Sequence, residues 1–210
     1  LARVAAVAAF AVAAHAAPHV PGDDATVLER LAVRPGDPVA RELRALRAAL
    51  ARDPRDLEVA LRLAGRYFEL AGEEGDPRYA GYAQAALKPW WDSPDAPIEA
   101  LVMRAIVKQY SHDFSGALRD LEAATRADPG NARAWSWRAA IHMVQADYIA
   151  ARADCAALRD IETGVGSACM AYLDGTTGKA AAAHRALAAV LARDPGGSPA
   201  ARVWLLTRLA

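Results

Sequence analysis

The sequence resembles itself at an interval of about 34 residues, and this limits the possible folds more than any other feature of the chain. Residues of similar size and polarity recur at this interval: Leu101 and Trp135, Arg104 and Arg138, Ala105 and Ala139, Asp113 and Asp147, Phe114 and Tyr148, and Ala117 and Ala151. This many matches at one offset indicate a repeated helix-turn-helix unit.

The clearest unit spans residues 131–158 and predicts two short helices, separated at Ala146 and Asp147. Small residues on the facing sides would let the helices approach closely, and large residues would fill the remaining gaps. The buried stripe is expected to contain Trp135, Ala139, His142, Tyr148, Ala151, Cys155 and Leu158.

The pattern resembles the tetratricopeptide repeat, whose first helix carries Trp, Leu-Gly and Tyr, and whose second carries Ala, a large aromatic residue and a closing Pro. Trp135, Ala139 and Ala151 fit this pattern, whereas Arg138, His142 and Cys155 replace Leu, Tyr and Phe. The resemblance is to exported bacterial members of the superfamily. It implies an all-α fold: a right-handed helical-repeat solenoid of antiparallel helix pairs, with no β-sheet.

The composition is that of a folded globular protein, with 54% hydrophobic residues, 24% charged residues and a formal net charge of zero. A balanced charge argues against nucleic-acid binding, which normally requires a basic domain or stripe. The 210 residues leave room for four to five repeats.

Residues 1–17 have the three-part pattern of a signal peptide: a positive charge at Arg3, an apolar run over residues 4–14 and small residues before a cleavage site near Ala16 or Ala17. The apolar run is shorter than the roughly 20 residues needed to span a bilayer, so no stable membrane span is expected after cleavage. The predicted location is exported, in the bacterial periplasm. The alternative is an Ala-rich helix that belongs to the fold.

Export would place Cys155 and Cys169 in an oxidising compartment. Cys155 is expected on the second helix of one repeat and Cys169 on the first helix of the next. Because these helices are neighbours in a stack, the two residues form either a disulfide or a pair of free buried thiols.

The remaining domain organisation follows from turn signals and helical periodicity. Residues 18–37 form a lead-in with a short helical segment near residues 26–31, and residues 38–54 form an N-terminal capping helix. The solenoid covers 55–210, with repeats at approximately 57–92, 95–129, 130–162 and 164–195 and a partial repeat at 198–210. The fourth repeat lacks about two residues, near Gly164 or within residues 174–178. Its first helix, near residues 166–173, is expected to be short and the least stable.

Motifs for catalysis, cofactors or metals are not found, and the chain is predicted not to be an enzyme. Residues 175–179 contain Gly and Lys without phosphate-loop spacing and are expected to form a turn. Consecutive Ser111, His112 and Asp113 cannot converge as a triad, and Asp113 is expected to cap a helix. Trp90 and Trp91, in an expected loop, either fill a junction between repeats or anchor a partner.

The resemblance also implies a binding surface, because the first helix of each pair lines the concave side of such solenoids. The predicted partner-binding residues in this concave groove are Glu58, Leu61, Phe68, Glu99, Val102, Ile106, Gln109, Tyr110, Arg133, Ser136 and Met143. Members that grip a chaperone carboxylate use Lys and Asn in this groove. Here those places hold Leu61, Gly65, Val102, Ile106, Ser136 and Ala140, so that activity is not implied.

Two hypotheses follow for function. The first is a scaffold or adaptor that binds a peptide or partner domain in the groove. The second is a structural or assembly protein that acts through self-association or end-to-end stacking of repeats. A small-ligand site near Tyr110, Arg133 and Glu99 is a third interpretation that no motif supports.

Overall fold

The computed structural model describes residues 20–23, 25–28, 36–193 and 199–209. The chain divides into a unit of residues 1–37 and a unit of residues 38–210. The predicted signal peptide lies outside the described residues. In the lead-in, residues 26–28 are not helical, contrary to expectation, and residues 29–31 lie outside the description. The carboxylate of Asp23 accepts a hydrogen bond from the Ala25 amide at 2.7 Å, which favours a local turn over a helix.

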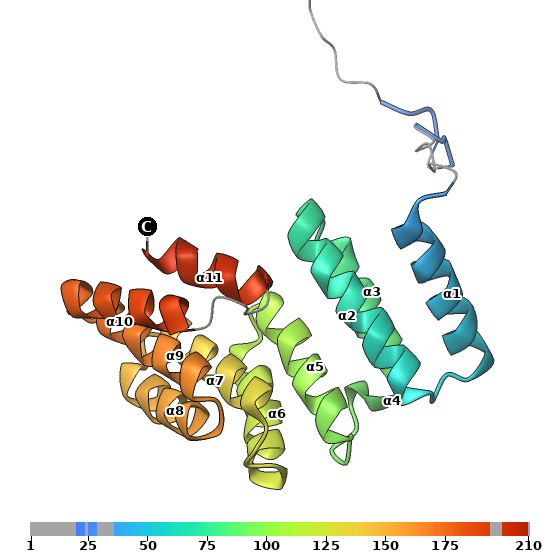
Figure 1. Cartoon of the computed structure of the whole chain (residues 1–210). Helices are drawn as coiled ribbons and strands as arrows, with labels where there is room; N and C mark the ends of the chain where they lie inside the picture. The colour runs from blue at the N-terminus through green and yellow to red at the C-terminus, as the bar shows by residue number, and fades with distance from the viewer. Residues whose placement is uncertain (1–19, 24, 29–35, 194–198, 210) are drawn as a thin grey trace, which may run out of the picture. The chain divides into compact units, whose positions relative to one another are not determined.

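In the described residues all regular secondary structure is helical (Figure 1). The helices are α1 (Pro38–Arg52), α2 (Leu57–Glu74), α3 (Arg78–Ala86), α4 (Lys88–Trp91), α5 (Ile98–Tyr110), α6 (Phe114–Ala127), α7 (Ala132–Val144), α8 (Tyr148–Ile161), α9 (Thr163–Thr176), α10 (Ala180–Arg193) and α11 (Pro199–Leu209). The segment predicted as a capping helix is α1, which packs against α2.

The second unit is a series of helix pairs: α2 packs on α3, α5 on α6, α7 on α8 and α9 on α10. The first helices also contact one another, α2 with α5, α5 with α7 and α7 with α9. Short turns force the helices of a pair to run antiparallel. Each of these turns contains a residue with positive φ: Gly75 at 66°, His112 at 61°, Ala146 at 60° and Gly178 at 95°. The repeated helix-turn-helix fold is therefore as predicted.

Side-chain caps mark where several of these helices begin. The carboxylate of Asp113 accepts a hydrogen bond from the Gly116 amide at 2.9 Å, as predicted for this residue. Asp56, Asn131 and Asp147 cap α2, α7 and α8 in the same way, each at 3.0 Å. Each cap satisfies an amide that has no partner inside its helix, so these residues fix the register of the repeats.

The repeat interval found in the sequence holds from α5 to α8. It separates Ile98 from Ala132, where α5 and α7 begin, and Phe114 from Tyr148, where α6 and α8 begin. It fails at α9, which begins at Thr163, three positions before the interval places it. The shortening lies between α8 and α9, where a single residue separates the helices. The expectation of a short first helix was wrong, since α9 has 14 residues.

A glycine permits the close contact between α8 and α9. A Cβ atom at Gly166 would lie 2.1 Å from Cα of Arg159, a backbone atom that cannot rotate away. No Cβ contact of this kind arises at Gly164, two residues earlier in the same helix, where nothing lies within 4 Å. The packing of α8 against α9 therefore requires glycine at position 166 but not at position 164.

The core of the second unit consists of two apolar clusters. The larger extends from Leu43 in α1 to Ile141 in α7, and the smaller joins Ala168 and Ala171 in α9 to Leu187 in α10. The predicted buried stripe is only partly correct. Trp135 and His142 are half-buried, and Tyr148 is 36% exposed.

Two ion pairs related by the repeat lie inside the solenoid. Arg104 and Asp120 are joined by Nη2 and Oδ1 at 2.6 Å, and Arg138 and Asp154, each one repeat interval further on, by Nη2 and Oδ1 at 2.5 Å. A second basic residue adjoins each aspartate: Lys108 Nζ lies 2.8 Å from Asp120 and His142 Nε2 lies 3.7 Å from Asp154. Arg138, the residue that departs from the repeat pattern, is therefore paired with Asp154, and this pair was not predicted from the sequence.

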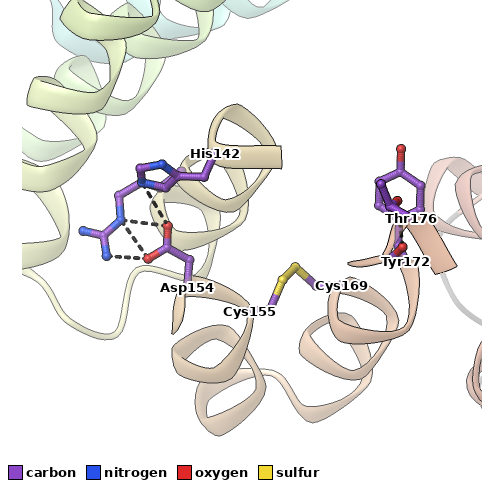
Figure 2. The surroundings of a disulfide bond; sticks show 7 residues. His142, Asp154, Cys155, Cys169, Tyr172 and Thr176 are labelled. Atoms are coloured by element: carbon purple, nitrogen blue, oxygen red, sulfur yellow. Dashed lines mark hydrogen bonds and ion pairs between the residues drawn. A yellow bond between two sulfur atoms is a disulfide. The ribbon is translucent and has the colours of Figure 1, made fainter. Parts of the chain in front are cut away.

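Cys155 and Cys169 form a disulfide that joins α8 to α9, with their Cα atoms 5.5 Å apart (Figure 2). Of the two alternatives left open by the sequence, the structure contains the bonded one. In the same view His142 lies beside Asp154, on the helix that carries Cys155.

The two adjacent tryptophans lie in the short helix α4, not in a loop. The carbonyl oxygens of Trp90 and Trp91 accept hydrogen bonds from Nη1 of Arg104 at 2.5 and 2.9 Å. Both rings are half-buried against the larger apolar cluster. These contacts favour the interpretation that the tryptophans fill a junction between repeats.

Candidate functional site

The predicted partner-binding residues lie on α2, α5 and α7, the three first helices that contact one another in sequence. These helices enclose a hollow of about 220 Å³, called the groove hollow here. Its lining comprises Leu61 and Gly65 from α2, Glu99, Val102 and Met103 from α5, and Asn131 and Arg133 from α7 and its cap. The structure thus brings together four of the predicted residues: Leu61, Glu99, Val102 and Arg133.

Two lining residues, Met103 and Asn131, were missed. Asn131 follows Asp128-Pro129-Gly130 and has the residue type of a helix cap, so its position at a helix entrance could have been predicted. Met103 is 2% exposed and next to Val102, and no feature of its sequence environment distinguishes it from the other apolar residues of α5.

Ile106 is 1% exposed and lies outside the lining of the groove hollow, so its role as a partner-binding residue stays a prediction. The physical reason for its burial is the position of α5, which packs against α2, α3, α6 and α7 and is buried along residues 100–107. Val102 is also buried at 3% and contributes only to the floor of the groove hollow.

Aromatic rings hold the first helices together beside the groove hollow. The ring of Phe68 on α2 meets that of Tyr110 on α5 at 5.9 Å and that of Trp137 on α7 at 6.1 Å, both edge to face. Such pairs stabilise packing beyond the area that they bury. Phe68 and Tyr110 are half-buried in this cluster, so they support the site without lining the hollow.

The other predicted residues lie outside the lining. Glu58 is exposed on the first turn of α2, and Gln109, Ser136 and Met143 are half-buried. The structure assigns them no contact with the groove hollow. Their role as partner-binding residues stays a prediction.

Arg133 is the positively charged residue that lines the groove hollow. Its Nη2 atom lies 3.9 Å from Sδ of Met103, and no carboxylate of the described residues forms an ion pair with it. Desolvation lowers the pKa of the Arg133 guanidinium below its usual value, although the residue as a whole is still exposed to solvent. The desolvation therefore acts on a guanidinium that lies against an apolar floor, not on a fully buried side chain.

Arg66, on the neighbouring helix α2, shows the opposite environment. It lies within 3.6 Å of Glu42 and Glu73 and donates a hydrogen bond to Glu69 at 2.8 Å. The hydrogen bond to Glu69 is the main reason that the pKa of Arg66 is raised above its usual value. The comparison indicates that Arg133 lacks the counter-charge that Arg66 has.

A second hollow, of about 410 Å³, lies among α9, α10 and α11. Its lining is mostly small and apolar, with Tyr172, His184 and Arg208 as the larger polar groups. The guanidinium of Arg208 lies over the rings of Tyr172 and Trp204, at 4.6 and 5.4 Å from their centroids. The Arg208 guanidinium is thus attracted to two aromatic rings of the same chain.

Solved structures with the same architecture identify the fold. The thermophilic TPR protein TTC0263 of Thermus thermophilus is 17% identical, with a TM-score of 0.65 over 81% of this chain and 90% of that chain. The chain has the helical-repeat fold of this tetratricopeptide-repeat structure. MamA, at 16% identity and a TM-score of 0.56, matches 73% of this chain and 86% of its own. PilW, described as a type IV pilus biogenesis factor, is 18% identical with a TM-score of 0.56 over 74% of this chain and 70% of its own.

Comparison at the sequence level adds no relative, since neither a protein-family model nor a curated protein matches this chain. The described helices include none that is both long and apolar enough to cross a membrane. Within the same residues, no three His, Cys, Asp or Glu side chains are grouped as a metal site would require.

Proposed function

We propose that this TPR protein is an exported, non-enzymatic scaffold that binds a peptide or partner domain in the groove formed by α2, α5 and α7. The general role of an interaction scaffold is supported by the fold of its structural neighbours. The observation that carries the proposal is the groove hollow, in which three successive first helices present an apolar floor together with Glu99 and Arg133.

Export is supported by two independent features. Residues 1–17 have the pattern of a signal peptide, and the disulfide between Cys155 and Cys169 suits an oxidising compartment. Fractionation of cells that express the full chain, followed by N-terminal sequencing, tests this part. An uncleaved protein in the cytoplasmic fraction would contradict it.

A blocked groove gives the sharpest test of binding. A Cβ atom at Gly65 meets nothing within 4 Å, and Gly65 lines the groove hollow, so Gly65→Leu is designed to place its side chain in that space. The change also improves the helical propensity of α2. The matched control is Gly81→Leu, because Gly81 is equally open but lies on α3, outside the lining. Peptides selected from a displayed random library should lose binding to Gly65→Leu and keep it to Gly81→Leu. Selected peptides that bind both variants equally would refute the proposal.

The second candidate function, self-association, is favoured by the exposed apolar side chains of α11. Val203, Trp204 and Leu206 are 60%, 38% and 47% exposed. Light scattering over a range of concentrations tests this candidate. A monomer at every concentration would exclude it, and an assembly abolished by Val203→Ser with Leu206→Ser would support it.

A further inference from the structure

The groove hollow contains two unlike charges without partners. Neither Glu99 nor Arg133 forms an ion pair within the described part of the chain, although both line the same hollow. Arg104 and Arg138, inside the solenoid, differ in this respect, since each forms an ion pair with an aspartate. The charges of the groove are therefore not used by the fold.

The surroundings of Arg133 favour the binding of an anion to its guanidinium group. One of its guanidinium nitrogens faces the thioether sulfur of Met103, a weak acceptor that compensates little for lost water. A carboxylate is the group that restores this loss best, because the planar guanidinium can donate two parallel hydrogen bonds to it. Beside it, the side-chain oxygen of Asn131 is used by the Ala134 amide, which leaves the NH₂ group of Asn131 to donate.

The space between the charges is apolar and small. Leu61, Val102 and Met103 form its floor, and Gly65 leaves it open above α2. Its volume of about 220 Å³ lies below the range of about 300–1,000 Å³ that is typical of sites for drug-sized ligands. The space suits one apolar side chain of an extended segment better than a small-molecule cofactor.

We propose that the groove hollow binds an extended peptide in which an apolar residue lies between an acidic and a basic residue. The acidic side chain pairs with Arg133, the basic side chain pairs with Glu99, and the apolar side chain rests on Leu61, Val102 and Met103. This inference rests on the proposed function and adds the chemistry of the partner. Charge complementarity of this kind selects among partners and sets their register.

Charge reversal tests the inference on the full chain. Peptides are first selected from a displayed random library, and the winners are synthesised for fluorescence anisotropy. Arg133→Glu should weaken binding by at least about tenfold, and a peptide whose acidic residue is replaced by Lys should regain it. Glu99→Lys should show the reciprocal preference. Arg119→Glu is the matched control, since Arg119 is exposed on α6, outside the lining.

The outcomes separate this inference from the proposed function. Selected peptides that lose binding to Gly65→Leu but show no charge preference would overturn the inference and leave the groove function intact. No enrichment, or peptides indifferent to Gly65→Leu, would overturn both. Circular dichroism of each variant shows whether it is folded, and Arg133→Glu should fold normally because Arg133 has no ion-pair partner in the described chain.

Discussion

Substitution of Gly166 by alanine tests the close contact between α8 and α9. The added Cβ would lie 2.1 Å from Cα and 2.2 Å from the backbone nitrogen of Arg159. Nonbonded carbon atoms normally stay about 3.5–4.0 Å apart, so α9 would have to move roughly 1.5 Å away from α8. Gly164→Ala is the matched control, because it adds the same methyl group to the same helix in open space.

The expected magnitude follows from two opposing effects. Overpacking costs about 1–3 kcal/mol, and here the upper part applies because the obstacle is backbone. Alanine gains up to about 1 kcal/mol over glycine in a helix. Gly166→Ala should therefore lower the free energy of unfolding by about 2 kcal/mol, whereas Gly164→Ala should raise it by about 0.5 kcal/mol near the end of the helix.

Urea denaturation followed by far-UV circular dichroism measures both variants. Alkylation under denaturing conditions shows whether Cys155 and Cys169 remain bonded, which separates a packing defect from a lost disulfide. The difference between the variants, about 2.5 kcal/mol, corresponds to roughly 5–10 °C in melting temperature. Equal stability of Gly166→Ala and Gly164→Ala would refute the packing argument.

Three further predictions concern the scaffold. Asp120→Asn leaves Arg104 without its buried counter-charge and should cost about 3–5 kcal/mol in denaturant unfolding. Ala146→Gly relieves a positive φ of 60° and should stabilise the protein by about 0.5–1 kcal/mol, measured in the same way. The hydrogen bond from Arg152 lowers the pKa of Asp174, so the Asp174 carboxylate contributes stability that is complete above its unfolded pKa of about 3.9 and is lost as pH falls through its folded pKa. Asp174→Asn should therefore flatten the acid limb of the stability–pH curve.

Each of these predictions has a control on the same scaffold. Glu122→Gln removes an exposed pair with Arg126 and should change stability by less than about 1 kcal/mol. Ala140→Gly places glycine within α7 and should destabilise by up to about 1 kcal/mol. Asp160→Asn, which removes an exposed carboxylate on α8, is the matched control for Asp174→Asn. If a variant changed the stability or its pH dependence by the same amount as its control, the structural reason given for that variant would be refuted.

The repeat interval predicted the helix pairs because it reports side chains that must face the same neighbours in every unit. It did not reveal the Asp120 and Asp154 ion pairs, although these residues also lie one repeat interval apart. An aspartate on an amphipathic helix usually faces solvent, and only the arginine across the helix pair shows that these two are buried. The sequence showed that Arg104 and Arg138 occupy equivalent positions in two repeats, but it did not show that each pairs with an aspartate.

The helices that form the groove were predicted from the sequence, but the burial of the residues along them was not. Helical spacing places Val102 and Ile106 on the same face as Glu99, but it does not reveal that α5 packs against four other helices and that Val102 and Ile106 are buried. The requirement for glycine at position 166 was equally hidden, since it depends on how closely two backbones approach. Properties of this kind depend on distances between helices, to which a periodic pattern is insensitive.

The covalent link between α8 and α9 has a mechanical consequence. If the two ends of the chain were pulled apart, the residues between Cys155 and Cys169, which are separated by 14 positions, could not extend. At about 3.4 Å per residue, the fully stretched chain with the disulfide intact would be roughly 40 Å shorter than the fully stretched chain with the disulfide reduced. A load carried through this protein would therefore pass across the α8–α9 junction by a bond between side chains, while the repeats on either side could still open under tension.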